Sequence, residues 1–327
     1  MKLHRPLRRL LSGVFVAVSA TLLSGSVFAQ TAPSAARSMT MIVPFAAGGP
    51  ADLVGREVAR LLSLELGRTV VVENQGAASG TVALNTMSRA APDGNTMLLA
   101  ASGTVVVHPL LVGKYEAVTK QLAPVSLVST SPHVLVVTDK IPVRTVEQLL
   151  AYARANPGKL NFGSAGTGGV AHLGMEMFKA QAKIDAVHVP YKGTSQVLAD
   201  LVSGEVQALF SSMPSLKAMI DKGSIHAIGM TGPSSQSAGI PEISKAGLPG
   251  FGYTTWYGMY VPAGTPAEAI ERLNGALVKV LSNQDLQQKL ASQGLDLKSS
   301  TPAELATLAS SEARSWQAII TSAGIKA

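Results

Sequence analysis

The fold is decided by residues 39–52, which read MTMIVPFAAGGPAD and join a short apolar run to a glycine-rich turn and a helix start. Residues 163–169, GSAGTGG, repeat this arrangement more than a hundred positions later, again between an apolar run and a helical pattern. A helix start presents backbone N–H groups without partners, and glycine lets a ligand approach them closely. The two turns therefore predict one anion that is held from two sides.

Strand-like and helix-like segments alternate through most of the chain, which predicts an α/β sheet with crossover helices. We expect strands at residues 39–43, 69–72, 96–100, 160–162, 186–189 and 206–210, and helices at 52–66, 81–89, 170–182, 195–202 and 216–221. Two apolar runs, 124–128 and 134–137, are separated by residues 129–132, where we expect the chain to cross between two lobes. The aromatic run 253–261 is the expected return strand.

Three threonines are expected to cap helices, each with an amide or carboxylate side chain three positions later. These pairs are Thr145 with Gln148, Thr265 with Glu268, and Thr301 with Glu304. Thr265 and Thr301 are also followed by proline, which suits the first position of a helix. The sequence therefore predicts helix starts at all three threonines.

The first 29 residues have the composition of a secretory signal peptide. Lys2, Arg5, Arg8 and Arg9 precede an apolar stretch over residues 10–23, and Val27-Phe28-Ala29 supplies a small-residue cleavage site. The apolar stretch is about 14 residues long, which is shorter than the roughly 20 that span a bilayer. We therefore expect export, and the general secretory and twin-arginine routes are both open.

Charge and cysteine content exclude several classes of function for the mature chain. The leader holds four of the 27 Lys and Arg residues, so 23 basic residues remain against 20 Asp and Glu. This balance, without a basic run that contains aromatic residues, argues against nucleic-acid binding. The chain has no cysteine, which excludes disulfides and a lipid-modified cysteine after the signal. The remaining roughly 298 residues suffice for two domains with separate cores.

Enzymatic motifs are incomplete in this sequence. Residues 166–171 match the G-x-G-x-x-A pattern of dinucleotide-binding proteins, but Asp185, the acidic residue at the expected spacing, stands at the start of a strand instead of its end. Phe162 takes the place of the first glycine that a hydrolase nucleophile elbow needs. The histidines of the mature chain are isolated, without an H-E-x-x-H pattern. We expect no catalytic residue, no metal site and no cofactor.

Three ionisable residues near the glycine turns each have two interpretations. Asp52 is either a helix-start residue that interacts with the helix dipole, or the group that orders the first turn around a ligand. His172, in the first turn of a helix, either faces a bound anion or packs against its neighbours. Lys192 is either solvated or a cation beside the anion. The sequence leaves all three open.

A series of short motifs in a fixed order resembles one known family, the Bug family of periplasmic substrate-binding proteins of tripartite tricarboxylate transporters. The motifs are residues 43–52, 71–74, 91–94, 163–168, 172–173, 189–193, 255–258 and 262–266. This resemblance covers nearly the whole mature chain and implies a type II periplasmic-binding-protein fold (Venus flytrap) of two α/β lobes with a hinge between them. Lobe 1 is expected to hold residues 30–131 plus 255–327, and lobe 2 residues 132–254.

The resemblance also implies a function and partners. The protein is expected to be a soluble periplasmic monomer without a lipid anchor. It is expected to capture a small organic carboxylate between its lobes and to deliver it to integral-membrane transporter subunits. One alternative is a ligand-presenting component of a carboxylate-sensing system. The other alternative, suggested by the G-x-G-x-x-A pattern of residues 166–171, is an exported dinucleotide-dependent enzyme.

The ligand contacts of similar proteins imply candidate binding residues in both glycine turns and at one strand end. The candidates are Phe45, Ala46, Gly48, Gly49 and Asp52 on one wall, Ser164, Gly166, Thr167, Gly168 and His172 on the other, and Ser102, Gly103 and Thr104 after a strand. This chain departs from the common family pattern at Gln75-Gly76, Gly169 and Ser211. The last two changes open space and remove a carboxylate, which disfavours an amino acid as ligand and favours a larger carboxylate.

Overall fold

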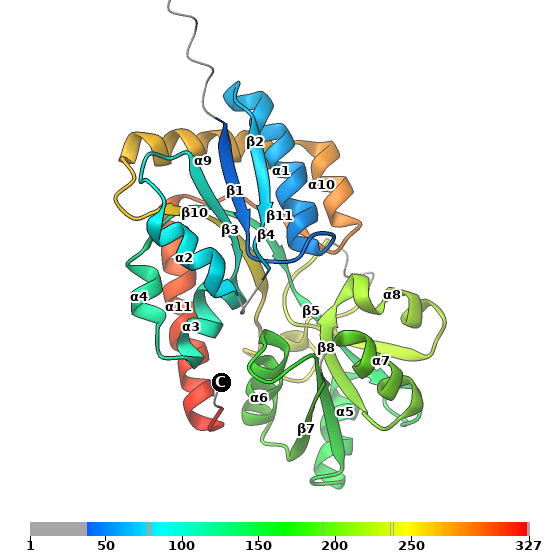
Figure 1. Cartoon of the computed structure of the whole chain (residues 1–327). Coiled ribbons are helices and arrows are strands. Elements are labelled where there is room, and N and C mark those ends of the chain that lie inside the picture. The colour runs from blue at the N-terminus through cyan, green and yellow to red at the C-terminus, as the bar shows by residue number, and fades with distance from the viewer. Residues whose placement is uncertain (1–37, 77–79, 192, 236, 238, 326–327) are drawn as a thin grey trace, which may run out of the picture. The chain divides into compact units, whose positions relative to one another are not determined.

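A computed structural model describes residues 38–76, 80–191, 193–235, 237 and 239–325 (Figure 1). The expected signal peptide, residues 1–29, and Lys192 lie outside the described residues. Within the described part of the chain, two separate β-sheets carry the fold. Each sheet is flanked by helices, as the alternating sequence pattern predicts.

The first sheet has six strands in the order β11-β4-β10-β3-β1-β2. Its strands are β1 (Met39–Val43), β2 (Val70–Asn74), β3 (Thr96–Ala101), β4 (Leu122–Ser131), β10 (Thr255–Pro262) and β11 (Asp296–Leu297). β1 pairs in parallel with β2 and β3, whereas β10 runs antiparallel between β3 and β4. The helices beside this sheet are α1 (Pro50–Leu66), α2 (Thr81–Arg89), α9 (Ala267–Leu281), α10 (Gln284–Ala291) and α11 (Pro302–Ser322).

The second sheet has five strands in the order β7-β6-β8-β5-β9. Its strands are β5 (His133–Thr138), β6 (Leu160–Ser164), β7 (Ala186–Pro190), β8 (Ala208–Ser212) and β9 (Ile225–Met230). Its helical segments are α5 (Val146–Ala155), α6 (Val170–Ala182), α7 (Thr194–Ser203), α8 (Met213–Asp221) and the short 3₁₀ segment Ile243–Lys245.

The chain passes from the first sheet to the second at Pro132, between the end of β4 and the start of β5. Proline has no backbone N–H, so it cannot continue a ladder of strand hydrogen bonds. The chain returns to the first sheet after Tyr253, where β10 begins. These two crossing segments lie close together, because β10 pairs with β4 as far as Thr255 opposite Ser131.

Most expected elements are confirmed, and α2 and α6 begin and end at the expected residues. Helix α1 begins at Pro50, two residues before the expected start at Asp52. Strand β9 was not expected, because its sequence mixes Gly229 and Ala227 with His226 and so has weak strand propensity. Also unexpected is a series of short helical turns after β3: a π-helical turn at Gly103–Val107, α3 (His108–Leu111) and α4 (Tyr115–Thr119). Turns this short have no readable helical period.

The three expected helix caps have different outcomes. At Thr301 the capping box is confirmed, since its hydroxyl accepts from Glu304 N–H at 3.2 Å and Glu304 Oε2 accepts from Thr301 N–H at 2.8 Å. At Thr145 the cap is confirmed, but the Gln148 side chain accepts from Arg144 N–H at 2.6 Å instead of Thr145 N–H.

The expected cap at Thr265 is wrong. The Thr265 hydroxyl donates to Pro262 O at 2.8 Å, and helix α9 begins at Ala267 without a side-chain cap. The buried Thr265 hydroxyl therefore stabilises the turn that follows β10 and does not cap α9.

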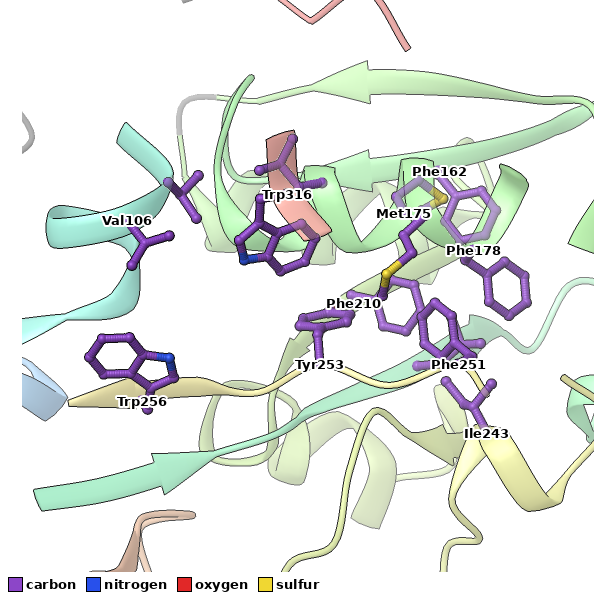
Figure 2. Close-up of a cluster of buried hydrophobic side chains, with 14 of the residues drawn as sticks. Val106, Phe162, Met175, Phe178, Phe210, Ile243, Phe251, Tyr253, Trp256 and Trp316 are labelled. Carbon is purple, nitrogen blue, oxygen red and sulfur yellow. The ribbon is translucent and has the colours of Figure 1, made fainter. Parts of the chain in front are cut away.

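One buried apolar cluster reaches both sheets, so the expectation of two separate cores is only partly met. The cluster contains Leu98 of β3, Phe210 of β8 and Trp316 of α11. Figure 2 shows Trp316 close to Tyr253, beside the phenylalanines of the second sheet, and the Trp316 and Tyr253 ring centroids are 5.6 Å apart. Two smaller clusters each stay with one sheet. Helix α11 thus ties the second sheet to the first.

Candidate functional site

A cavity of about 790 Å³ lies between the two glycine turns. Residues 44–46 line it from the first turn, and residues 165–171 line it from the second turn and the start of α6. The π-helical turn and α3 add Gly103, Thr104, Val107, His108 and Leu111. Strand residues at the sheet crossings complete the lining: Ala101, His133, Thr255 and Tyr257, with Gly76 and Gly80 beside the first turn.

The first glycine turn is ordered by the Asp52 carboxylate. Gly48 N–H donates to Asp52 Oδ2 at 2.9 Å, and Arg56 Nε donates to the same oxygen at 3.0 Å. Asn74 Nδ2 donates to Asp52 Oδ1 at 2.9 Å and to Phe45 O at 3.2 Å. The Arg56 hydrogen bond is the largest cause that holds the pKa of Asp52 below its usual range. The carboxylate is therefore ionised and its oxygens are turned into the protein.

Glycine is required beside this turn at two places, one where a backbone and one where a side chain approaches closely. A Cβ atom on Gly76 would lie 2.4 Å from Ala46 N, and one on Gly80 would lie 2.4 Å from Thr104 Cγ2. Gly80 also has a φ of +89°, a conformation that side chains disfavour. Gly76, one of the positions where this chain departs from the common family pattern, thus allows its own backbone segment to lie against the first turn.

The second glycine turn opens directly into α6. Gly169 occupies the N-cap position and no side chain caps the helix. The unpartnered N–H groups of the first turn of a helix and the helix dipole favour an anion at such an end. Gly169, Val170 and Ala171 all line the cavity. The start of α6 therefore presents backbone N–H groups and the positive end of the helix dipole to the cavity.

His172 supports the second turn from behind. Its Nδ1 accepts from Gly168 N–H at 3.0 Å, and its ring stacks on His188 with a centroid distance of 3.7 Å and an interplanar angle of 17°. Burial, with a contribution from Lys179, lowers the pKa of His172. Because Nδ1 is an acceptor, the neutral ring carries its proton on Nε2, which lies 3.8 Å from Glu176 Oε1.

Ser164 lies in the same buried layer. Its hydroxyl donates to Gly166 O at 2.9 Å and lies 2.6 Å from His188 Nε2. Burial is the largest cause that lowers the pKa of His188 to about 4. The turn 163–169 is thus supported by two neutral imidazoles and a hydroxyl.

The two turns are built alike in one respect. Gly48 and Gly168 have φ values of +87° and +78°, and each donates its N–H to the side chain four residues later. That side chain is the third residue of the following helix, Asp52 in α1 and His172 in α6. The acceptor is a carboxylate in one turn and an imidazole in the other.

The structure brings seven of the thirteen expected site residues to the cavity surface: Phe45, Ala46, Gly103, Thr104, Gly166, Thr167 and Gly168. The other six do not line it: Gly48, Gly49, Asp52, Ser102, Ser164 and His172. Ser102 is fully buried, and within the described residues its hydroxyl has no hydrogen-bond partner. Three of these six, Asp52, Ser164 and His172, support a turn from behind, a role that sequence spacing does not separate from direct contact.

Several lining residues were missed from the sequence. Thr255 and Tyr257 are two apart on β10, so strand alternation places them on one face of the sheet. This alternation could have identified them together from the sequence. His133 lines the cavity where β5 begins, with Nδ1 3.1 Å from the Tyr253 hydroxyl and Nε2 3.3 Å from Thr255 Oγ1. Burial lowers the pKa of His133 to about 4. His108 had no signal, because the short helix that places it was not expected.

The cavity is almost free of formal charge. Among the residues that the structure describes, no Lys, Arg, Asp or Glu lines it. Within the same residues, no group of three His, Cys, Asp or Glu side chains could hold a metal ion. Backbone N–H groups, hydroxyls and imidazoles are therefore the groups available to a ligand.

A protein-family model described as the tripartite tricarboxylate transporter family receptor matches residues 54–325. The chain belongs to this family. The resemblance inferred from the motifs is therefore confirmed, and so is the two-lobed α/β fold.

Individual relatives agree with this membership. Protein BugT of Bordetella pertussis is 31% identical over 323 residues, which cover 96% of each chain. The Rpa4515 protein of R. palustris, solved with adipate, is 28% identical with a TM-score of 0.75 and covers 89% of this chain and 98% of its own. MatC from Rhodopseudomonas palustris, solved with bound malate, is also 28% identical, with a TM-score of 0.70 and coverages of 87% and 99%.

Family membership decides the general role of the site. Family members are periplasmic solute-binding receptors that work with membrane transporter components, so this chain is a binding receptor and not an enzyme. Within the described residues, no helix is long and apolar enough to cross a membrane.

Proposed function

We propose that this receptor binds a small organic carboxylate in the cavity between its two glycine turns and delivers it to integral-membrane transporter subunits. The observation that carries the proposal is the start of α6, which has no side-chain cap and opens into a cavity without formal charge. A carboxylate there would accept charge-assisted hydrogen bonds from backbone N–H groups.

The candidate residues divide into two groups by what they would do. The seven that line the cavity are proposed to contact the ligand beside the backbone N–H groups of Gly169 and Val170, because the Gly168 N–H already donates to His172. Asp52 and His172, with Ser164, are proposed to hold the turns in the conformation that binds. The ionised Asp52 suits this indirect role, because a carboxylate facing an anionic ligand would repel it.

Ligand size and polarity follow from the lining. A volume of about 790 Å³ exceeds the needs of a two- or three-carbon acid. Val107, Leu111 and Val170 add apolar surface between the polar turns. The ligand is therefore proposed to carry at least one carboxylate and an apolar body, as adipate does in the relative solved with it.

Binding is proposed to close the two lobes, because contacts from both turns exist together only when the lobes approach. The proposed lobes are residues 30–131 plus 255–327 and residues 132–254, which meet at the two sheet crossings. The exported protein is proposed to be a periplasmic monomer without a lipid anchor. A dimer in light scattering of the purified protein would contradict the monomer.

A thermal-shift screen tests the ligand class. The purified protein is heated with mono-, di- and tricarboxylates, both aliphatic and aromatic, and with the matching amides as uncharged controls. A ligand at about 100 times its dissociation constant adds roughly 2.7 kcal/mol of stability and so raises the melting temperature measurably. A panel in which no carboxylate raises the melting temperature would show that the ligand class is wrong.

A further inference from the structure

One imidazole in the cavity is not engaged with other groups. His108 lines the cavity from the first position of α3, and no hydrogen bond or ion pair involves its ring within the described residues. The other lining imidazole, His133, has both ring nitrogens within hydrogen-bond distance of hydroxyls, on Tyr253 and Thr255. His108 is therefore the histidine that has its ring nitrogens free to meet a ligand.

The position of His108 on α3 turns it toward the second glycine turn. Residues three apart share one face of a helix, so His108 and Leu111 point to the same side. Leu111 lies directly against the second turn, since a Cβ atom on Gly168 would be 2.7 Å from Leu111 Cδ1. Three residues of α-helix rise only about 4.5 Å. His108 therefore lines the cavity within about one helical turn of Leu111, the residue that packs against the second glycine turn.

The π-helical turn makes a second contact of the same kind. A Cβ atom on Gly103 would lie 3.8 Å from Val170 Cγ2. Gly103 in turn accepts a hydrogen bond from the backbone N–H of His108. Two points near His108 thus touch the start of α6 from the side of the six-stranded sheet.

Electrostatics define what fits between His108 and α6. The start of a helix carries a partial positive charge, and an imidazole N–H is also a positive donor. An anion that lies between two such groups in one cavity is stabilised by both. No carboxylate side chain among the described residues lines the cavity to take this place.

We propose that His108 and the start of α6 hold one and the same ligand carboxylate from opposite lobes. This proposal rests on the proposed function and adds to it that a single carboxylate is enough to bridge the lobes. The first glycine turn, at Phe45 and Ala46, is then left for the remainder of the ligand. A second carboxylate on the ligand is therefore not needed for binding.

Calorimetric titration of the wild type and of His108→Leu, which has no hydrogen-bond donor, with hexanoate and adipate tests the proposal. These acids have the same number of carbons but one and two carboxylates. Loss of one charge-assisted hydrogen bond predicts about 10- to 100-fold weaker binding of both acids, by a similar factor. His226→Leu is the matched control, since His226 bonds to Asp139 outside the cavity and its replacement should leave both affinities unchanged.

Each other outcome has a definite meaning. Unchanged affinity of His108→Leu for both acids would overturn the proposal while the proposed function stands. A loss confined to adipate would also overturn it, because His108 would then hold the second carboxylate. A wild type that binds no carboxylate in the thermal-shift panel would overturn the proposed function itself, and this proposal with it.

Two measurements guard against a folding defect in the variant. The melting temperature of His108→Leu without ligand should match that of the wild type, and His108→Phe provides a second substitution without a donor. In the wild type, the imidazole carbon resonance of His108 should shift on addition of hexanoate, whereas the His226 resonance should not. Absence of a His108 shift at saturating hexanoate would contradict the proposal without any mutation.

Discussion

The two glycine turns share one backbone hydrogen-bond arrangement, but the side chain that accepts the hydrogen bond differs in charge between them. In each, a glycine with positive φ donates its N–H to the third residue of the following helix. The acceptor in the first turn is Asp52, an ionised carboxylate bonded to Arg56 and Asn74. The acceptor in the second turn is His172, a buried neutral ring stacked on His188. The comparison teaches that the turn nearer the proposed anion site is supported without a negative charge.

The largest expected effect comes from giving the second turn the support of the first. His172→Asp keeps an acceptor for Gly168 N–H but places a negative charge beside the start of α6. Repulsion of a ligand carboxylate should weaken binding about 100-fold or more, or about 2.7 kcal/mol. Calorimetry with the best ligand of the carboxylate panel measures this. Wild-type affinity in His172→Asp would show that the anion does not bind near α6.

Removal of the Asp52 carboxylate, which supports the first turn, should chiefly lower the free energy of unfolding. Asp52→Ala leaves Gly48 N–H and Asn74 Nδ2 without their acceptor and leaves Arg56 without its ion pair. We expect a loss of about 2 kcal/mol in the free energy of unfolding, measured by urea denaturation. Gln288→Ala, at an exposed position of α10, serves as a control for substitution in a helix beside the same sheet. A destabilisation equal to that of the control would mean that Asp52 does not hold the first turn.

Acidification should separate the two turns. The pKa values of His172 and His188 are lowered in the folded protein, the latter to about 4. Below about pH 6.5 the unfolded state then binds more protons, so this part of the stability falls as the pH drops toward 4. The lowered pKa of Asp52 keeps the first turn intact until the pH falls below 3.8.

Amide hydrogen exchange at pH 7, 5.5 and 4.5 measures this difference. Residues 163–171 should lose protection before residues 44–49, and His172→Gln should flatten the pH dependence of the second turn alone. Equal loss of protection in both turns would remove the distinction between their supports.

The smallest expected effect concerns the partner of Asp52. Arg56 is about half exposed, with 54% of its side-chain surface accessible, so its ion pair with Asp52 is screened by solvent. Arg56→Gln should lower the free energy of unfolding by no more than about 1 kcal/mol. The loss should shrink further in 0.5 M salt, and carboxylate affinity should not change. A loss as large as that of Asp52→Ala would make Arg56, not the carboxylate, the centre of the first turn.

Local signals in the sequence were sufficient for the elements and for the position of the site. Strand–turn–helix patterns gave α2 and α6 to the residue, and the two glycine turns do face one cavity. Identical local motifs were not sufficient where tertiary contacts compete. Thr-Pro-Ala-Glu caps α11 at Thr301, yet at Thr265 the hydroxyl bonds to Pro262 O in the turn after β10.

The site residues show the same limit. Asp52 and His172 stand at helix positions from which a side chain either faces a ligand or turns back to its own glycine, and only the folded backbone distinguishes these directions. His108 and His133 reach the cavity because a short helix and a strand start place them there. Neither element has a period that identifies which residues point inward.

The buried apolar cluster that reaches both sheets also provides an intrinsic tryptophan fluorescence signal. The chain has two tryptophans, and both belong to this buried cluster at the level where the chain crosses between sheets. Trp256 donates through Nε1 to Glu312 Oε2 at 2.7 Å, and burial raises the pKa of Glu312 to about 7. The proposed closure of the lobes would alter the surroundings of these indoles. Their ultraviolet emission can therefore follow lobe closure in real time without an added dye.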